Sequence, residues 1–159
     1  MVIARCGYRD TRVPDPHAPP MIIAICGSLT FFKNLRDLQK QLKSLGHIAL
    51  LPKGIRLLET GKHQKSQTIA ERLKAEAKYD FIREHFRKIE KADTVLVANY
   101  DKKGIKGYIG GNTFLEMGIA FYLGKKIYLL YPIPEMEYSK LEMHAMQPVV
   151  VYGDVTKII

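Results

Sequence analysis

The chain has 159 residues and a formal net charge of +9, and 47% of its residues are hydrophobic, which is typical of one soluble globular domain. A domain of this length buries enough surface to fold without a disulfide or a structural metal ion. No apolar run approaches the roughly 20 residues that span a bilayer. Arg and Pro interrupt the N-terminal segment where a signal peptide would be apolar, and neither cysteine has a CxxC partner. We therefore expect a cytoplasmic protein that does not contact a membrane.

The positive charge is concentrated in one part of the chain. Residues 33–91 hold 15 Lys or Arg and 7 Asp or Glu, whereas residues 92–159 hold 7 of each. Such a surplus fits a solvated basic helix face, or attraction of a phosphate-bearing small molecule or of nucleic acid. Because no basic run with interleaved aromatic residues occurs, nucleic acid is an unfavoured partner.

The first elements follow from proline content and hydrophobic periodicity. Residues 1–20 contain "VPDPHAPP", with four prolines in eight residues, which predicts a flexible N-terminal extension. The continuous apolar run "MIIAICG" (21–27) is typical of a strand buried on both faces of a parallel sheet. Residues 30–46 have apolar positions at helical spacing, and residues 47–52 form a second short strand.

The remaining chain continues the alternation of strands and helices. The elements are predicted as a polar loop (53–67), one long helix (68–92), a strand (93–100), a Gly/Lys-rich loop (101–112), a helix (113–124), a strand (125–132), a short helix (136–146) and a strand (148–154). Five strands alternating with helices predict a three-layer Rossmann-like α/β fold for residues 21–159. The sheet is expected to be mainly parallel and five-stranded, in the flavodoxin-like order, with helices on both faces.

In such folds ligands bind beyond the carboxyl ends of the strands, and the first strand ends in Gly27-Ser28-Leu29. Backbone N–H groups and the Ser28 hydroxyl at this turn can hold a phosphate. The alternative is a tight strand–helix turn in which Ser28 caps the helix. The chain has neither GxGxxG nor a Walker motif, so neither dinucleotide nor triphosphate binding is predicted.

The third strand ends in Asn99-Tyr100-Asp101, whose side chains can bind a sugar hydroxyl or a base. The alternative for Asn99 and Asp101 is an Asx turn at a strand end. Lysines that favour an anionic ligand, or that are simply solvated, follow at 102, 103 and 106.

"GGNTFLEMG" (110–118) carries a lone carboxylate, Glu116, three residues after Thr113. This spacing matches a capping box, in which Glu116 would bond the backbone at the helix start. A carboxylate at the ligand-binding edge, held ionised by the helix dipole, also suits a nucleophile. The two interpretations are compatible, because a carboxylate fixed at the helix start also points toward the ligand.

"EKADTVLVANYD" (90–101) and "GGNTFLEMGIAFYLGKKIYLLYP" (110–132) resemble the core of the nucleoside 2-deoxyribosyltransferase superfamily. "CGSL" (26–29) is similar to the first turn of the branch that hydrolyses 2'-deoxynucleoside 5'-phosphates. The resemblance covers roughly residues 21–154. It implies a homodimer or larger assembly in which Glu116 attacks C1' of the sugar, and water or another base then resolves the glycosyl-enzyme.

The resemblance and the strand ends together predict the site residues. His85 stands where the family usually has Asp, eight residues before Asp93, and it can exchange protons near pH 7 or simply be a buried helix residue. Asp101 is the other expected catalytic partner of Glu116. Substrate contacts are predicted from Gly27, Ser28, Leu29, Phe31, Asn99, Tyr100, Gly111, Asn112 and Thr113.

Three functions are compatible with these residues. The first is cleavage or transfer of the N-glycosidic bond of a nucleoside or nucleoside 5'-monophosphate. The second is ribonucleotide phosphoribohydrolysis, since "GGNTFLE" is one residue short of GGxGTxxE. The third is a non-catalytic nucleotide-binding or sensor module on the same fold. Neither a metal nor a cofactor is expected, because His17, His47, His63 and His144 lack metal-ligand spacing.

Overall fold

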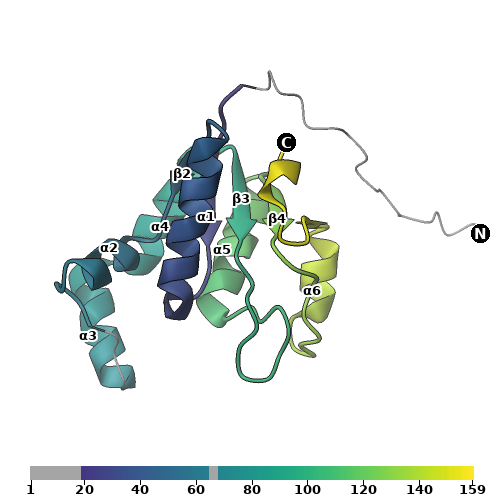
Figure 1. Cartoon of the computed structure of the whole chain (residues 1–159). Coiled ribbons are helices and arrows are strands. Elements are labelled where there is room, and N and C mark those ends of the chain that lie inside the picture. Colours follow the sequence, from purple (N-terminus) through teal and green to yellow (C-terminus); the bar gives the residue numbers. More distant parts are fainter. Residues whose placement is uncertain (1–18, 65–67) are drawn as a thin grey trace, which may run out of the picture.

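The computed structural model describes residues 19–64 and 68–159, so nearly all of the predicted N-terminal extension lies outside the described residues. At its centre is a five-stranded, all-parallel sheet with the order β2-β1-β3-β4-β5 (Figure 1). The strands are β1 (Ile22–Cys26), β2 (Ile48–Leu50), β3 (Thr94–Val97), β4 (Lys126–Leu129) and β5 (Val149–Val150). The three-layer Rossmann-like fold and its flavodoxin-like strand order are thereby confirmed.

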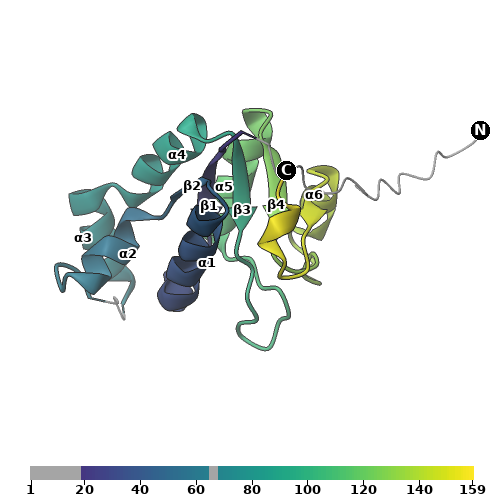
Figure 2. The same cartoon turned by 45° about the horizontal axis from the view of Figure 1, so that its top comes forward.

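Helices cover both faces of this sheet. They are α1 (Phe32–Ser44), α2 (Lys53–Glu59), α3 (Ile69–Tyr79), α4 (Phe81–Lys91), α5 (Gly111–Tyr122) and α6 (Lys140–Ala145), with 3-10 turns η1 (Leu29–Phe31) and η2 (Val155–Lys157). Figures 1 and 2 show α1 in front of the sheet and α4 and α5 behind it. Among the described residues, no helix combines the length and apolarity needed to cross a membrane.

Strand β1 supplies side chains to two separate cores. Because successive side chains of a strand point to opposite faces, Ile23 and Ile25 pack in the layer of α1, whereas Ala24 and Cys26 pack in the layer of α4 and α5. All four are fully buried. The apolar run in the sequence therefore marks a strand covered on both faces, as predicted, and it directs Cys26 toward α4 and α5.

Two of the predicted element boundaries are wrong. The single helix over 68–92 is two helices, because Asp80 adopts a left-handed conformation (φ 51°) that ends α3 and precedes α4. The polar loop predicted over 53–67 contains α2. Gly54 packs closely against Leu29, because a Cβ atom there would come within 2.6 Å of Leu29 Cδ1 and the leucine side chain would have to move.

Helix α5 also begins earlier than predicted, at Gly111 with Gly110 as its N-cap and no side-chain cap. The capping box assigned to Thr113 and Glu116 is therefore wrong, and Glu116 lies in the second turn of the helix. A residue there is too far along the helix to bond the first free N–H groups. A capping box does occur at the start of α3, where Thr68 and Glu71 bond each other's backbone N–H groups.

The Asn99 side chain holds the loops at the carboxyl edge of the sheet together. Its Nδ2 donates to the carbonyl oxygens of Gly107 (3.3 Å), Tyr131 (2.9 Å) and Pro132 (3.2 Å). Its Oδ1 accepts from the backbone N–H of Tyr131 at 2.9 Å. Asn99 is 1% exposed, so these bonds satisfy an amide that water does not reach.

We expect Gly107→Ala to destabilise the fold more than Gly104→Ala. Both glycines have positive φ, 62° and 74°, which costs an L-residue about 1 kcal/mol or more. At Gly107 the new Cβ would also lie 2.7 Å from the Pro132 oxygen and 3.0 Å from Asn99 Nδ2, whereas at Gly104 it meets nothing within 4 Å. In urea unfolding, Gly107→Ala should lower the free energy of unfolding by roughly 3 kcal/mol. Equal losses in the two variants would contradict this packing.

Candidate functional site

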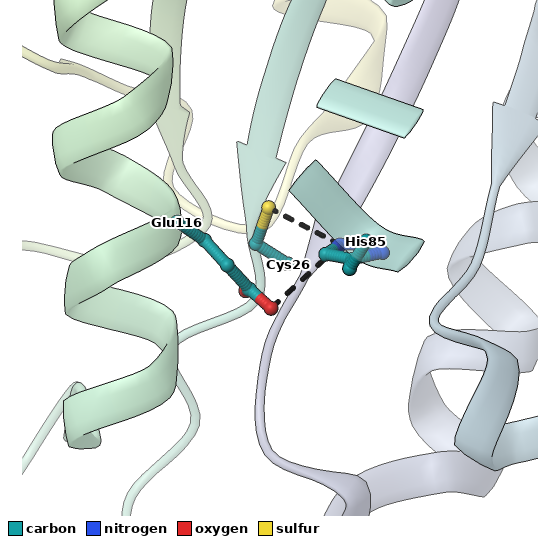
Figure 3. A group of neighbouring side chains, drawn as sticks. All are labelled: Cys26, His85 and Glu116. Atoms are coloured by element: carbon teal, nitrogen blue, oxygen red, sulfur yellow. Dashed lines mark hydrogen bonds and ion pairs between the residues drawn. The ribbon is translucent and has the colours of Figure 1, made fainter. Parts of the chain in front are cut away.

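Three ionisable side chains from three elements meet below the carboxyl edge of the sheet (Figure 3). Cys26 ends β1, His85 comes from α4 and Glu116 from α5. The Cys26 Sγ lies 3.6 Å from His85 Nε2, and the same nitrogen lies 3.9 Å from Glu116 Oε1. One ring nitrogen therefore faces both the thiol and the carboxyl group.

The placement of these side chains follows from the periodicity of each element. His85 precedes the fully buried Ile89 by four residues, so the two lie on the core face of α4. Glu116 is three residues after the buried Thr113 and four before the buried Ala120, on the core face of α5. Their side chains consequently point toward the sheet face that also carries Cys26.

Burial keeps this triad uncharged at neutral pH. Burial, assisted by the positive charge of Lys88 and opposed by the Ile25 carbonyl, lowers the pKa of His85 to about 4. Burial raises the pKa of Glu116 to about 8, although a hydrogen bond with Cys26 opposes this. The pKa of the Cys26 thiol is raised by burial and by the nearby carboxyl group. The 3.9 Å contact thus joins a neutral imidazole and a mainly protonated carboxyl group, not an ion pair.

This geometry does not suit a cysteine nucleophile. In a Cys-His-acid triad the acid orients one imidazole nitrogen while the other activates the thiol. Here Cys26 and Glu116 face the same nitrogen, Nε2. A reactive thiol also needs a lowered pKa, whereas that of Cys26 is raised. Glu116 is therefore the better nucleophile candidate of the three.

The predicted phosphate turn contains an ammonium group. Ser28 Oγ accepts from the backbone N–H of Thr30 at 3.3 Å, so Ser28 caps η1. This is the strand–helix turn that the sequence offered as the alternative to a phosphate site. Lys102 Nζ also donates to Ser28 Oγ (3.0 Å) and to Thr30 Oγ1 (2.9 Å). The turn after β1 thus combines hydroxyl groups, backbone N–H groups and a positive charge, which is a suitable environment for an anion.

Aromatic rings lie beside this turn. Phe31 packs against Tyr100 with ring centroids 5.2 Å apart, and Tyr100 packs against Tyr131 at 5.9 Å. Burial raises the pKa of Tyr100 to about 12, so its hydroxyl group stays protonated. Tyr100, Tyr131 and Asp101 also line a cavity of about 830 Å³, large enough for a nucleotide-sized ligand.

The other predicted site residues differ in their surroundings. The Asp101 carboxylate accepts from the Gly107 N–H at 2.8 Å and is not part of the triad. Gly111 and Asn112 are exposed at the start of α5, and Thr113 is buried.

The predicted contact residues near β1 and β3 have structural partners. Leu29 packs against the core, and the Asn99 amide is already bonded to backbone groups. Gly27 packs beside Ala98 and Leu35.

The triad lines neither of two cavities that lie among the described residues. The larger one lies beyond Tyr100, and one of about 420 Å³ lies between α1, α2 and α4. The Glu116 side chain nevertheless keeps 12% of its surface exposed, so it is not fully enclosed by the protein.

Sequence reasoning missed Cys26 as a site residue, and it named Lys102 as a lysine that favours an anionic ligand without finding its partners. Cys26 precedes Gly27-Ser28 directly, and the alternation of β1 already places it on the same face as Ala24. Lys102 was recognised only as one of several lysines near the strand end. Its contacts with Ser28 and Thr30 cross more than 70 residues of sequence, so no local spacing could reveal them.

No protein-family model matches the chain, and a search of curated proteins found no significant match. The resemblance to the nucleoside 2-deoxyribosyltransferase superfamily therefore stays a prediction that rests on the residues quoted above.

We expect Glu116→Gln to remove a pH dependence of stability. The carboxyl pKa is about 8 in the folded protein against 4.5 unfolded, so the folded state holds the proton more tightly. Protonation of Glu116 therefore adds its full contribution to the free energy of unfolding below about pH 4.5, and this contribution is lost as the pH rises through about 8. In urea unfolding, the free energy of unfolding of the wild type should fall by on the order of 3 kcal/mol between about pH 5 and pH 8, relative to that of Glu116→Gln.

His85 is present in both proteins, so its own titration largely cancels in this comparison. The exposed Glu137→Gln is the matched control and should track wild type at every pH. A constant difference between wild type and Glu116→Gln across this range would contradict the raised pKa.

Proposed function

We propose that the protein cleaves or transfers the N-glycosidic bond of a deoxynucleoside or deoxynucleoside 5'-monophosphate, with Glu116 as nucleophile. The observation that carries the proposal is the position of Glu116, whose carboxyl group lies 3.9 Å from His85 near the carboxyl end of β1. Ligands of this fold class bind at that edge. The anion-binding turn and the aromatic rings beside it supply groups for a phosphate and a base.

In the first step a Glu116 carboxylate oxygen attacks C1' of the sugar. The bond between C1' and the base nitrogen breaks, its electron pair stays on the nitrogen, and the base takes up a proton from water. In the second step water attacks C1', which frees the sugar and releases a proton to solvent, or another base attacks through a nitrogen, loses its N–H proton to solvent and gives a new nucleoside. Both outcomes regenerate the Glu116 carboxylate, so one site can serve a hydrolase or a transferase.

The raised pKa of Glu116 sets the pH dependence of this chemistry. With a pKa of about 8, only about a tenth of the free protein carries the carboxylate at pH 7. Positive charge develops on the sugar in the oxocarbenium-like transition state, and this charge stabilises the adjacent carboxylate. Burial therefore weakens the resting nucleophile but strengthens its attraction to the transition state, because the local dielectric constant is low.

The substrate groups match the surroundings of the triad. Strands β1 and β3 are hydrogen-bonded neighbours, so the segments that follow Cys26 and Val97 start side by side. We place a 5'-phosphate at the Ser28 and Lys102 groups and a base against Tyr100 and Tyr131. Asp101 lines the same cavity as these rings and is proposed to contact the base.

The proposal includes a cytoplasmic homodimer or larger assembly. Exposed apolar side chains on α5 offer a surface for subunit contacts: Leu115, Phe121 and Tyr122. Large exposed apolar groups of this kind are typical of interaction surfaces when they lie together.

A non-catalytic nucleotide-binding module is the second candidate, and the neutral state of the triad favours it. At pH 7 neither His85 nor Glu116 is mainly charged, so neither a strong acid nor a full nucleophile is present in the resting protein. Nucleotide binding by calorimetry without release of base would support this candidate. Release of base from ribonucleotides alone would instead support phosphoribohydrolase activity.

We expect purified protein to release free base from a panel of deoxynucleosides and their 5'-phosphates. Its kcat/KM should rise with pH up to about 8, because this quantity reports the ionisation of the free protein. Glu116→Ala should lower kcat by roughly 10³-fold or more. The exposed Glu137→Ala serves as control and should keep full activity. Unchanged turnover in Glu116→Ala would exclude the nucleophile role.

We expect Lys102→Ala to discriminate between phosphorylated and unphosphorylated substrates. Loss of a charge-assisted bond to phosphate should raise KM for 5'-phosphates roughly 10- to 100-fold. KM for the unphosphorylated deoxynucleosides should change little. Lys103→Ala is the matched control, because its ammonium group faces the Tyr108 ring instead of the turn. An equal effect of Lys102→Ala on both substrate groups would contradict the phosphate site.

A further inference from the structure

We propose that Cys26, His85 and Glu116 form a binding site for one zinc ion. The three side chains offer a sulfur, a nitrogen and an oxygen, and these ligand atoms all lie within 4.8 Å of one another. Figure 3 shows the three groups converging from β1, α4 and α5 on a common point. This inference does not depend on the proposed glycosidic chemistry, since it concerns only what the triad binds.

Two of the three separations are close to those around a tetrahedral zinc ion, and the third, between the Cys26 sulfur and a Glu116 oxygen, is within 4.8 Å. Zinc binds Cys sulfur at about 2.3 Å, His nitrogen at about 2.0–2.1 Å and carboxylate oxygen at about 2.0–2.2 Å, so neighbouring ligand atoms are roughly 3.4–3.6 Å apart. The Cys26 Sγ to His85 Nε2 distance is 3.6 Å, and His85 Nε2 to Glu116 Oε1 is 3.9 Å. A rotamer adjustment that brings the Glu116 oxygen closer to Sγ and Nε2 would complete the coordination.

The triad also contains buried polar atoms that lack partners. Glu116 Oε2 and His85 Nδ1 are inaccessible to solvent and have no hydrogen-bond partner, and His85 as a whole is 2% exposed. Unpaired buried polar groups cost free energy, because they lose their hydrogen bonds to water without replacement. A cation held by His85 Nε2, the Cys26 Sγ and the Glu116 carboxylate would give Glu116 Oε2 a partner, whereas His85 Nδ1, on the other side of the ring, would not contact it.

The donor set selects the class of metal. A thiolate and an imidazole exclude Ca²⁺ and Mg²⁺, which bind through oxygen ligands. Mixed sulfur, nitrogen and oxygen ligands in tetrahedral arrangement are typical of zinc. Three protein ligands leave a fourth position for water or a ligand, as in zinc sites that are not purely structural.

Metal binding and the proposed attack on C1' would compete, because a carboxylate bound to zinc is not free to act as a nucleophile. Zinc should therefore inhibit base release, and a chelator should restore it. The two proposals fail separately. Turnover in chelator-treated protein tests Glu116 as nucleophile, whereas metal binding is measured without substrate.

The test uses the full-length chain with Cys6→Ser, so that Cys26 is its only thiol. Metal-free protein is titrated with Co²⁺, and the thiolate-to-cobalt charge-transfer band and the tetrahedral d–d bands are recorded. We expect both to saturate at one Co²⁺ per chain and to disappear when Zn²⁺ displaces the cobalt. Competition with a chromophoric chelator then gives the zinc Kd.

Variants assign the ligands. Cys26→Ser should abolish the charge-transfer band, and Cys26→Ser or His85→Gln should each weaken zinc binding by more than roughly 100-fold, since loss of an outer-shell partner alone costs about 10- to 100-fold. His144→Gln, at an exposed position of α6, should bind like the parent. Absence of the cobalt bands in the parent, or bands unchanged by Cys26→Ser, would overturn the proposal even if another variant failed to fold.

Discussion

The fold depends on β1 being paired along both edges and covered on both faces. Its backbone groups bond β2 and β3, and its side chains alternate between two cores. Because such a strand has no solvent-facing side, its last residue, Cys26, must face a helical layer. The chain then turns at Gly27 next to the end of β3. The buried triad and the exposed anion-binding turn are thus two consequences of one strand end.

The triad places ionisable groups where the fold otherwise puts apolar side chains. Ile89 and Met117 lie next to His85 and Glu116 on their helices and are fully buried. In that environment each group favours its neutral form, which explains why the pKa shifts of His85 and Glu116 have opposite directions. Developing positive charge on a sugar and a bound cation would both reverse this preference. The same electrostatic environment therefore supports both the proposed chemistry and the proposed metal site.

The edge of the sheet combines a fixed part with an accessible part. Asn99 binds the loops after β3 and β4 to each other, so Tyr100 and Tyr131 are held beside Phe31. Asparagine at this strand end looked like a ligand group or an Asx turn in the sequence, but its amide bonds backbone groups from two distant loops. Such a fixed edge lowers the ordering cost of holding a flat ligand against the rings.

The fold class, the order of the strands and a carboxylate near the ligand-binding edge could be predicted from the sequence, because apolar runs, helical spacing and turn residues are local features. The break between α3 and α4 at Asp80 and the start of α5 could not be predicted, since both depend on tertiary packing that overrides local helix preference. Only the tertiary structure brought Cys26, His85 and Glu116 together and joined Lys102 to Ser28. These residues are separated by tens of positions in the chain, so no spacing records their contacts, and their protonation depends on burial that exists only once the layers have packed.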